Sequence, residues 1–546
     1  MNKEFTKYDI QIRNEIQSLI NSSKLDEALK LTVKYENIVG KNSEIYSFKS
    51  IIAIMKNNLF EAEKLLEEGL NENGDNFDLL YNRAYLYQRC NEKYPALIYY
   101  KWSLERTNDE EMKEQIKNII SELENELMEN KDYKNKVKKS EVRFSVVIPT
   151  RQGHEVLKYA IQTCINQDFD SYEIIVCDNF SSRETKEVVD SFNCKRIKYI
   201  RSTKPLSMSD NWELAVSYAK GEYIIAIGDD DGLLLHALKE IDKIIKRTST
   251  KAVKWDQVSY FWSSSSFNNK KDILSIPFSK VLFEQNAIDV LNDVINIRAN
   301  YSDLPMIYNS AIHRDLLGLL IYKTGRVFKS AVLDAYSGFT FGYLVKKFIS
   351  TKVPMSIAGV SGKSNGVACV HSTESNTIAK EFIQLNNESG LTLNVKVPNL
   401  YSFLTACYLG SFFDARDNLF PKDEMIIFDP KKHIIAYMNE LIGKTCKMKD
   451  ESLRKSNWEE GLKIIRNLVI EDKELLAWFD DQYYNYAEEF FKTNIKLKED
   501  EVEVTGFNNM CLTLDTKEFC VKNVYEAAEL CEKILGYKKY GIDWLE

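Results

Sequence analysis

Short apolar strands alternate with helical segments between residues 143 and 262, and this alternation constrains the fold more than any other feature of the chain. Strand patterns occur at 144–148, 172–177, 197–200, 222–227 and 252–262. Helical patterns lie between them, near 154–166, 182–192, 208–219 and 233–247. Strands that alternate with helices are typical of β-α-β units, so the sequence predicts an α/β domain with a parallel sheet.

Acidic residues follow two of these strands. Asp178 comes after the second strand, and the triplet Asp229, Asp230 and Asp231 comes after the fourth. Ligands of open α/β sheets bind outside the carboxyl ends of the strands. Three adjacent carboxylates repel one another unless a positive charge lies among them, and a divalent cation that carries a diphosphate would supply it.

Composition and charge exclude several classes of protein. A chain of 546 residues with 44% hydrophobic residues indicates three or four globular domains. The net charge of −8 argues against non-specific nucleic-acid binding, which needs a basic face. The ten cysteines form no C-x-x-C pair, so neither a zinc ribbon nor a thioredoxin-like site is indicated, and reduced thiols in a cytosol fit best. Since the N-terminus has no apolar signal core and no long apolar window occurs, we expect a cytoplasmic protein without a transmembrane helix.

The first 130 residues read as paired helices. Ala28, Ala62 and Ala96 stand 34 residues apart, each followed by apolar residues at helical spacing. A period of 34 residues resembles the tetratricopeptide repeat, and the alternative is an ordinary helical bundle. We therefore expect a repeat-like domain over 1–130, followed by a lysine-rich linker over 131–142 that either is solvated or binds an acidic partner.

Four blocks between 146 and 231 resemble glycosyltransferase family 2, whose fold is the GT-A nucleotide-sugar fold. They are 146–151, 174–182, 206–212 with 219–224, and the acidic motif 228–231. The resemblance implies a catalytic domain over 143–398 with a mixed sheet flanked by helices. From about residue 400 the apolar periodicity is again helical, so we expect a mainly helical C-terminal region over 399–546. The resemblance also implies a UDP-sugar site that contains Pro149, Thr150, Arg151, Asp178, Asn211, Asp229 and Asp230.

The acidic triplet is the predicted metal site. Asp229 and Asp231 alternate along the chain, so we expect both to face one Mn²⁺ or Mg²⁺ ion, with Asp230 toward the sugar or the other side of the sheet. His371 is a further candidate for the metal or a phosphate, and a structural histidine is the alternative. Taken alone, Asp178 could also cap a helix, and the triplet could be an exposed turn.

Two other patterns in the sequence could bind phosphate. Gly362, Lys363 and Ser364 look like the end of a P-loop, but Ile357 stands where the first glycine should be, so we reject that interpretation. Arg151, Arg201 and Lys204 follow predicted strands and either contact phosphate or are solvated surface charges.

An inverting transfer also needs a base for the acceptor hydroxyl. The segment 326–339 resembles the acceptor side of the family, and its Asp334 is the predicted base. A helix N-cap is the alternative role, and Asp303 and Glu374 are weaker candidates for the base.

These features predict a metal-dependent, inverting glycosyltransferase that moves a sugar, with GlcNAc as the first guess, from a UDP-sugar to an acceptor hydroxyl. Helical repeats present concave surfaces that suit protein segments. One predicted acceptor is therefore Ser or Thr of a protein, and the domain combination resembles transferases that modify bacterial flagellin. Two alternatives are capsule or lipid-linked glycan synthesis and an inactive repeat scaffold. Unused carboxylates crowded together are costly, which argues against the scaffold.

Overall fold

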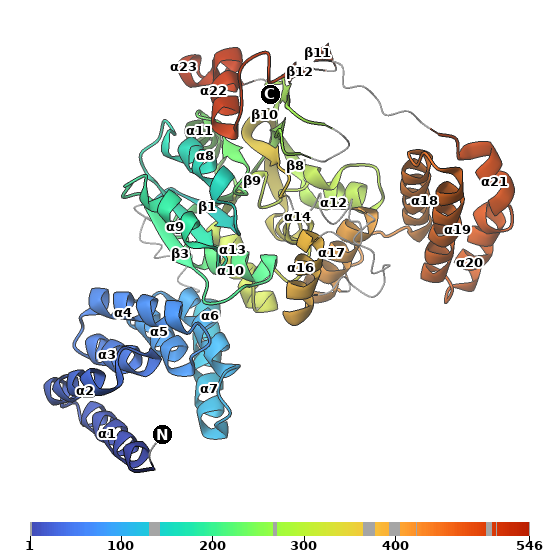
Figure 1. The fold of residues 1–546 in the computed structure, drawn as a ribbon. Coiled ribbons are helices and arrows are strands. Elements are labelled where there is room, and N and C mark those ends of the chain that lie inside the picture. The colour runs from blue at the N-terminus through green and yellow to red at the C-terminus, as the bar shows by residue number, and fades with distance from the viewer. Residues whose placement is uncertain are drawn as a thin grey trace. The chain divides into compact units, whose positions relative to one another are not determined.

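The computed structural model describes residues 3–129, 142–265, 270–363, 377–391, 404–421, 423–497, 505–508 and 510–544. The chain separates into two compact units (Figure 1). The first comprises residues 1–138 and 201–205, and the second comprises 139–200 and 206–546.

The first unit consists of antiparallel helices. They are α1 (Lys3–Asn21), α2 (Leu25–Val39), α3 (Ser43–Met55), α4 (Leu59–Glu72), α5 (Phe77–Arg89), α6 (Lys93–Leu104) and α7 (Glu110–Glu129). Ala28, Ala62 and Ala96 lie in α2, α4 and α6, and all three are fully buried. Their regular placement in the second helix of each pair is compatible with a 34-residue repeat, which stays a prediction.

The second unit is built on one large sheet. Its strands are β1 (Phe144–Thr150), β2 (Tyr172–Asp178), β3 (Ile197–Arg201), β4 (Tyr223–Ala226), β5 (Gly232–Leu233), β6 (Ala252–Phe261), β7 (Ile273–Pro277), β8 (Leu282–Asn286), β9 (Ser310–His313), β10 (Lys347–Val360), β11 (Gly506–Asn508) and β12 (Cys511–Asp515). The order is β11-β12-β7-β6-β9-β4-β1-β2-β3, and β10 pairs with β5, β6 and β8. β1 lies parallel to β2 and β4, whereas β9 is antiparallel to β4 and β6. The predicted mixed α/β sheet is therefore confirmed.

Helices cover both faces of the central strands. They are α8 (His154–Ile165), α9 (Arg183–Asp190), α10 (Met208–Ser217) and α11 (Ala237–Thr248). Phe144, Val146 and Ile148 of β1 pack in one core with residues of α8 and α11, while α10 contacts β1 and β2. Because both faces of β1 are covered, every residue of this strand is buried, which explains its continuous apolar sequence.

The residues after β8 form the other side of the domain. Their helices are α12 (Ala287–Ile295), η3 (Tyr301–Asp303), α13 (Arg314–Thr324), α14 (Leu333–Val345), α16 (Thr377–Glu388) and α17 (Leu404–Leu419). An aromatic core that includes Phe339 of α14 and Phe412 of α17 joins several of them.

The C-terminal region is mainly helical, as predicted. It continues with α18 (Pro430–Cys446), α19 (Glu451–Leu468), α20 (Lys473–Phe479), η4 (Asp480–Tyr484), α21 (Ala487–Asn494), α22 (Val524–Leu535) and α23 (Tyr537–Tyr540). Two of its features were not predicted. β11 and β12 extend the sheet beside β7, and α22 packs on α8 and β5. The buried ring of His236 bonds Glu532 of α22 through Nδ1 at 2.5 Å and the Pro354 carbonyl through Nε2 at 3.0 Å.

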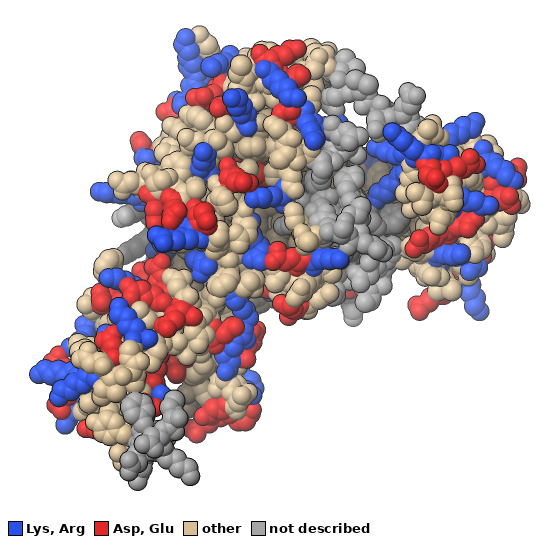
Figure 2. Space-filling model, in the orientation of Figure 1, with Lys and Arg blue, Asp and Glu red and all other residues tan. Residues whose placement is uncertain are grey.

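No helix within the described ranges is both long and apolar enough to cross a membrane. Figure 2 shows acidic and basic side chains interspersed over the described residues of the face that it draws. This mixed surface agrees with the modest net charge.

Candidate active site

A cleft of about 410 Å³ opens in the second unit where β1, β2 and β4 end. Its volume falls in the range of small-molecule sites. The lining comprises Pro149, Thr150, Arg151, Gln152, Gly153, Val156, Asn179, Leu206, Met208, Asn211, Trp212, Gly228, Asp229, Asp230, Tyr308, Ser361, Lys363, Ile378, Glu381, Phe382 and Leu385. Since these three strands are parallel, the cleft lies at the carboxyl edge where the sequence analysis expects a ligand.

Asp229 is fixed at the end of β1. Its Oδ2 accepts a hydrogen bond of 2.5 Å from Thr150 Oγ1. Gly153 makes this approach possible, because a Cβ atom there would lie 1.9 Å from Asp229 Oδ2. The side chains of Thr150 and Asp229 therefore line the cleft as one hydrogen-bonded pair.

Asp230 also lines the cleft and is held from the β10 side. Its Oδ2 accepts a hydrogen bond of 3.1 Å from Ser361 N, and its carbonyl accepts one of 3.1 Å from Trp262 Nε1. Gly359 lets the two segments meet, because a Cβ atom at this position would lie 1.9 Å from the Asp230 carbonyl oxygen.

Asp231 is buried and is not one of the lining residues of the cleft. Its two carboxylate oxygens accept hydrogen bonds of 2.7 Å from Gly228 N and Gly359 N. β4 ends at Ala226, and Asp229 and Asp230 form a turn, so the predicted alternation of Asp229 and Asp231 along a strand does not occur. The two carboxylates that share the cleft are neighbours in sequence.

Burial is the main cause that raises the pKa of each of these three carboxyl groups. Repulsion by Asp230 adds to the shift of the pKa of Asp229 and of Asp231. In the described ranges, no lysine or arginine forms an ion pair with the triplet, and no group of three or more His, Cys, Asp or Glu side chains is arranged for a metal ion. His371 and Glu374 lie outside the described residues.

Asp178, the predicted nucleoside ligand, lies beneath the cleft. It is fully buried; its Oδ1 accepts a hydrogen bond of 2.9 Å from Ser181 N, and its Oδ2 accepts one of 2.6 Å from the Tyr199 hydroxyl. Its neighbour Asn179 lines the cleft and hydrogen-bonds both backbone groups of Leu206 at 2.8 and 2.9 Å. The carboxylate thus fixes the turn after β2, as a capping residue does.

The remaining donor-site predictions lie in the cleft. Pro149 and Arg151 extend from the end of β1, and Asn211 extends from α10. Arg151 donates a hydrogen bond of 2.8 Å to the Asn179 carbonyl and forms an ion pair with Glu381 of α16. Arg201 and Lys204 are not in the cleft lining and belong to the segment grouped with the first unit.

Asp334 lies in the first turn of α14, and the helix has no side-chain N-cap hydrogen bond. Burial raises the pKa of the Asp334 carboxyl group. The Asp334 charge also contributes to raised pKa values of Tyr301 and Tyr308, so the carboxylate lies within electrostatic reach of both phenols. Tyr308 lines the cleft, whereas Asp334 is not one of its lining residues.

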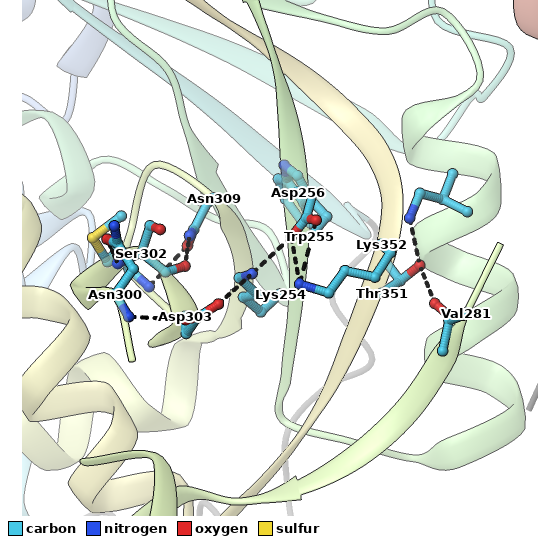
Figure 3. Close-up of polar contacts among 12 residues, drawn as sticks. Lys254, Trp255, Asp256, Val281, Asn300, Ser302, Asp303, Asn309, Thr351 and Lys352 are labelled. Atoms are coloured by element: carbon cyan, nitrogen blue, oxygen red, sulfur yellow. Dashed lines mark hydrogen bonds and ion pairs between the residues drawn. The ribbon is translucent and has the colours of Figure 1, made fainter. Parts of the chain in front are cut away.

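Asp303, the weaker candidate for the base, has structural partners. Its Oδ2 accepts a hydrogen bond of 3.1 Å from Asn300 N in a capping box, and its Oδ1 lies 3.8 Å from the Nζ of Lys254 (Figure 3). Lys254 is only 3% exposed and also pairs with Asp256 at 3.0 Å. These contacts tie η3 to β6.

Several residues of the cleft were not predicted. Trp212 and Tyr308 pack with ring centroids 4.7 Å apart, and Ile378, Phe382 and Leu385 of α16 add an apolar wall. Tyr308 and α16 are separated from the strand motifs by long stretches of sequence, and no local pattern marks them. Met208 and Trp212 stand inside a recognised block, where helical spacing toward Asn211 could have pointed to them.

Parts of this chain are similar to known proteins. Residues 145–300 match the family model described as Glycosyl transferase family 2. The chain is 36% identical over 102 residues to GalNAc(5)-diNAcBac-PP-undecaprenol beta-1,3-glucosyltransferase of Campylobacter jejuni, which covers 18% of this chain and 33% of that protein. It is 25% identical over 103 residues to UDP-Glc:alpha-D-GlcNAc-diphosphoundecaprenol beta-1,3-glucosyltransferase WfgD of Escherichia coli, which covers 19% of this chain and 41% of that protein.

The chain thus spans between a third and two fifths of the length of these curated relatives. Among solved structures, it is similar to S. aureus TarS 1–349 in complex with UDP-GlcNAc, with 15% identity and a TM-score of 0.36, over 67% of this chain and 100% of that chain.

Proposed function

We propose that the protein is a glycosyltransferase that moves a sugar from a nucleoside diphosphate sugar to an acceptor hydroxyl. One observation carries the proposal: Asp229 and Asp230 project, with no ion-pair partner among the described residues, into a cleft at the carboxyl edge of the family 2 domain. Around them stand hydroxyl, amide and aromatic groups of the kind that bind a sugar and a base: Thr150, Asn179, Asn211 and Trp212.

The donor that we propose is a UDP-sugar. UDP-GlcNAc is the first donor to test. UDP-glucose is the second, because the name of the relative WfgD specifies UDP-Glc. Arg151 supports a diphosphate ligand, since its guanidinium lines the cleft and exchange of Glu381 for a phosphate would keep the charge paired.

The carboxylates also fit a divalent cation. They are buried, they repel one another, and their oxygens are the ligands that Mg²⁺ and Mn²⁺ prefer. Asp229 and Asp230 would hold the ion, and Asp231 would join them by leaving one of its two backbone partners. When bound, the ion neutralises negative charge on the departing diphosphate.

Asp334 is the base in this proposal. Its carboxylate accepts the proton of the acceptor hydroxyl while the hydroxyl oxygen forms a bond to the anomeric carbon of the sugar. The bond from that carbon to the diphosphate oxygen breaks, and its electron pair leaves with the diphosphate. Attack opposite the leaving group inverts the anomeric centre, and the raised pKa of Asp334 brings its basicity closer to neutral pH.

Two acceptors are supported by different observations. The helical first unit supports a protein acceptor such as flagellin, because paired helices offer a surface for a peptide segment. The names of the Campylobacter jejuni and Escherichia coli relatives support a lipid-linked glycan, because both names specify sugars linked to undecaprenol diphosphate. An inactive scaffold is disfavoured, because crowded, buried carboxylates that bind no cation are costly.

A donor screen tests the proposal without knowledge of the acceptor. The protein is incubated with Mn²⁺ and each of several UDP-sugars and GDP-sugars, and release of the nucleoside diphosphate by slow hydrolysis is measured. We expect the wild type to release UDP, and we expect the rate of UDP release by Asp229→Asn to be at least tenfold lower. Absence of release and of binding for every nucleotide sugar would contradict the proposed function.

A further inference from the structure

The loop from residue 300 to residue 309 is anchored far more firmly than a surface connection requires. At its start, Asp303 pairs with the buried Lys254, which in turn pairs with Asp256 of β6 (Figure 3). Lys352 of β10 lies 3.4 Å from the same Asp256 carboxylate. A buried lysine is costly unless it is paired, so this cluster holds η3 against the sheet at a defined position.

A second set of contacts fixes the end of the loop. Asn309 accepts a hydrogen bond of 3.0 Å from Met306 N and donates one of 2.8 Å to the Ser302 carbonyl. Ile307 N donates a hydrogen bond of 3.0 Å to Ser337 Oγ of α14. The helix can approach so closely because residue 338 is glycine, where a Cβ atom would lie 2.9 Å from the Met306 side chain.

Tyr308 is the residue that this anchoring presents to the cleft. Its carbonyl accepts a hydrogen bond of 3.2 Å from Gln257 Nε2, and its ring packs on Trp212 at a tilt of 54°. In the part of the chain that the structure describes, no hydrogen bond is made by its hydroxyl, although the residue lines the cleft. Backbone and ring are therefore fixed, and the polar tip is left for a ligand.

The surroundings of the phenol define the kind of ligand. Burial raises the pKa of the Tyr308 hydroxyl well above its ordinary value, and the charges of Asp231, Asp334, Asp230 and Asp229 add to this effect. The hydroxyl therefore keeps its proton and can donate it in a hydrogen bond. Tyr308 lines the cleft together with Asp229 and Asp230, which is where the sugar must stand if the diphosphate binds at these two carboxylates.

We propose that the Tyr308 hydroxyl donates a hydrogen bond to a hydroxyl group of the donor sugar and thereby selects which sugar the protein accepts. This inference rests on the proposed function. A site that is built to pair with a substrate hydroxyl rejects an analogue without it, because the buried partner is then left unsatisfied. Tyr308 would act on the sugar and leave recognition of the nucleotide unchanged.

Calorimetric titration of UDP, UDP-GlcNAc and UDP-glucose in the presence of Mn²⁺ tests the proposal on the full-length protein. In Tyr308→Phe, we expect UDP affinity within twofold of the wild type and a loss of about 3- to 10-fold for the preferred UDP-sugar. The ratio of the affinities for UDP-GlcNAc and UDP-glucose should decrease by a similar factor. Tyr260→Phe is the matched control, because its hydroxyl is buried without a partner in the described structure and lies outside the cleft.

A second measurement begins with the wild-type protein alone, so that its first result does not depend on the folding of the variant. Monodeoxy forms of the preferred UDP-sugar, each lacking one sugar hydroxyl, are titrated into the wild-type protein. One of them should lose about the same factor, and Tyr308→Phe should show no further loss with that analogue. Equal affinity of all the analogues, or of the wild type and Tyr308→Phe for every donor, overturns the inference. A wild type that binds no nucleotide sugar at all would instead refute the proposed function and the inference with it.

Discussion

Asparagine substitutions at Asp334 and Asp303 should separate the base from a structural acid. Both aspartates lie on the acceptor side of the sheet, but their contacts differ. Asp334 lies in the first turn of α14, where hydrogen bonds from the backbone of Asp334 and Ala335 partly offset the effect of burial on the pKa of its carboxyl group. Asp303 is held instead by Asn300 N at 3.1 Å and by Lys254 at 3.8 Å. We expect Asp334→Asn to lose activity and Asp303→Asn to lose mainly stability.

The magnitudes follow from these environments. General-base assistance contributes about 10²–10⁴-fold, so kcat of Asp334→Asn should fall by that factor. Because burial raises the pKa of Asp334, ionisation of this group costs stability as the pH rises through its raised pKa. Removal of the charge should therefore leave the melting temperature at pH 8 unchanged or higher.

Asp303→Asn keeps an oxygen for Asn300 N but removes a charge beside Lys254, which retains Asp256 at 3.0 Å. We expect a loss of about 1–2 kcal/mol in the free energy of unfolding. This corresponds to a fall of about 2–6 °C in melting temperature for a domain of this size. Since the anchored loop loosens only in part, kcat should fall less than about fivefold.

The assay measures donor-dependent transfer between pH 5 and 9, together with thermal melting of each variant. The wild type and Asp303→Asn should lose kcat as the pH falls through the raised pKa of Asp334, and Asp334→Asn should lack this dependence. Near-normal turnover of Asp334→Asn with an intact pH dependence would show that the base lies elsewhere. A loss of more than a hundredfold in a fully stable Asp303→Asn would assign the role to Asp303.

Three further predictions concern the donor side and the first unit. Excess EDTA should abolish sugar transfer, and Asp229→Asn and Asp230→Asn should each lower turnover at least tenfold with Mn²⁺ present; full activity in EDTA would refute the metal. Asp178→Ala removes the acceptor of Ser181 N and of the Tyr199 hydroxyl, so the free energy of unfolding should fall by about 1–3 kcal/mol; an unchanged melting temperature with weakened UDP affinity would mean that Asp178 contacts the nucleoside. Removal of residues 1–138 should preserve UDP-sugar hydrolysis and abolish transfer to the natural acceptor; transfer at the full-length rate would exclude acceptor recruitment by these residues.

The central sheet could be predicted because its signals are local. β1, β2 and β4 are largely apolar runs that end in polar turns, and burial on both faces requires such runs. The same strands bring Thr150, Asn179 and Asp229 to one edge, since parallel strands end together. The donor side of the cleft was therefore visible in residues 146–231 of the sequence.

The side-chain directions within that edge could not be predicted. Asp231 accepts a hydrogen bond from the N–H of Gly359, which is more than a hundred residues away in the sequence, so no local pattern could reveal the orientation of this carboxylate. The role of Asp178 beneath the cleft likewise depends on Tyr199 of β3. β11 and β12 are short strands whose pairing with β7 is a long-range contact without a local pattern.

The two sides of the cleft are built from different kinds of structural element, and this difference bears on sugar specificity. The proposed diphosphate side depends on strand ends whose positions are set by the core of the sheet. The sugar and acceptor side depends on the loop that carries Tyr308, on the start of α14 at Asp334 and on α16, each held by a few polar contacts. Because those contacts can be exchanged without rebuilding the sheet, the same donor-binding edge can serve different sugars and acceptors. Exchange of the loop and α16 between related chains should therefore transfer sugar preference while leaving UDP affinity unchanged.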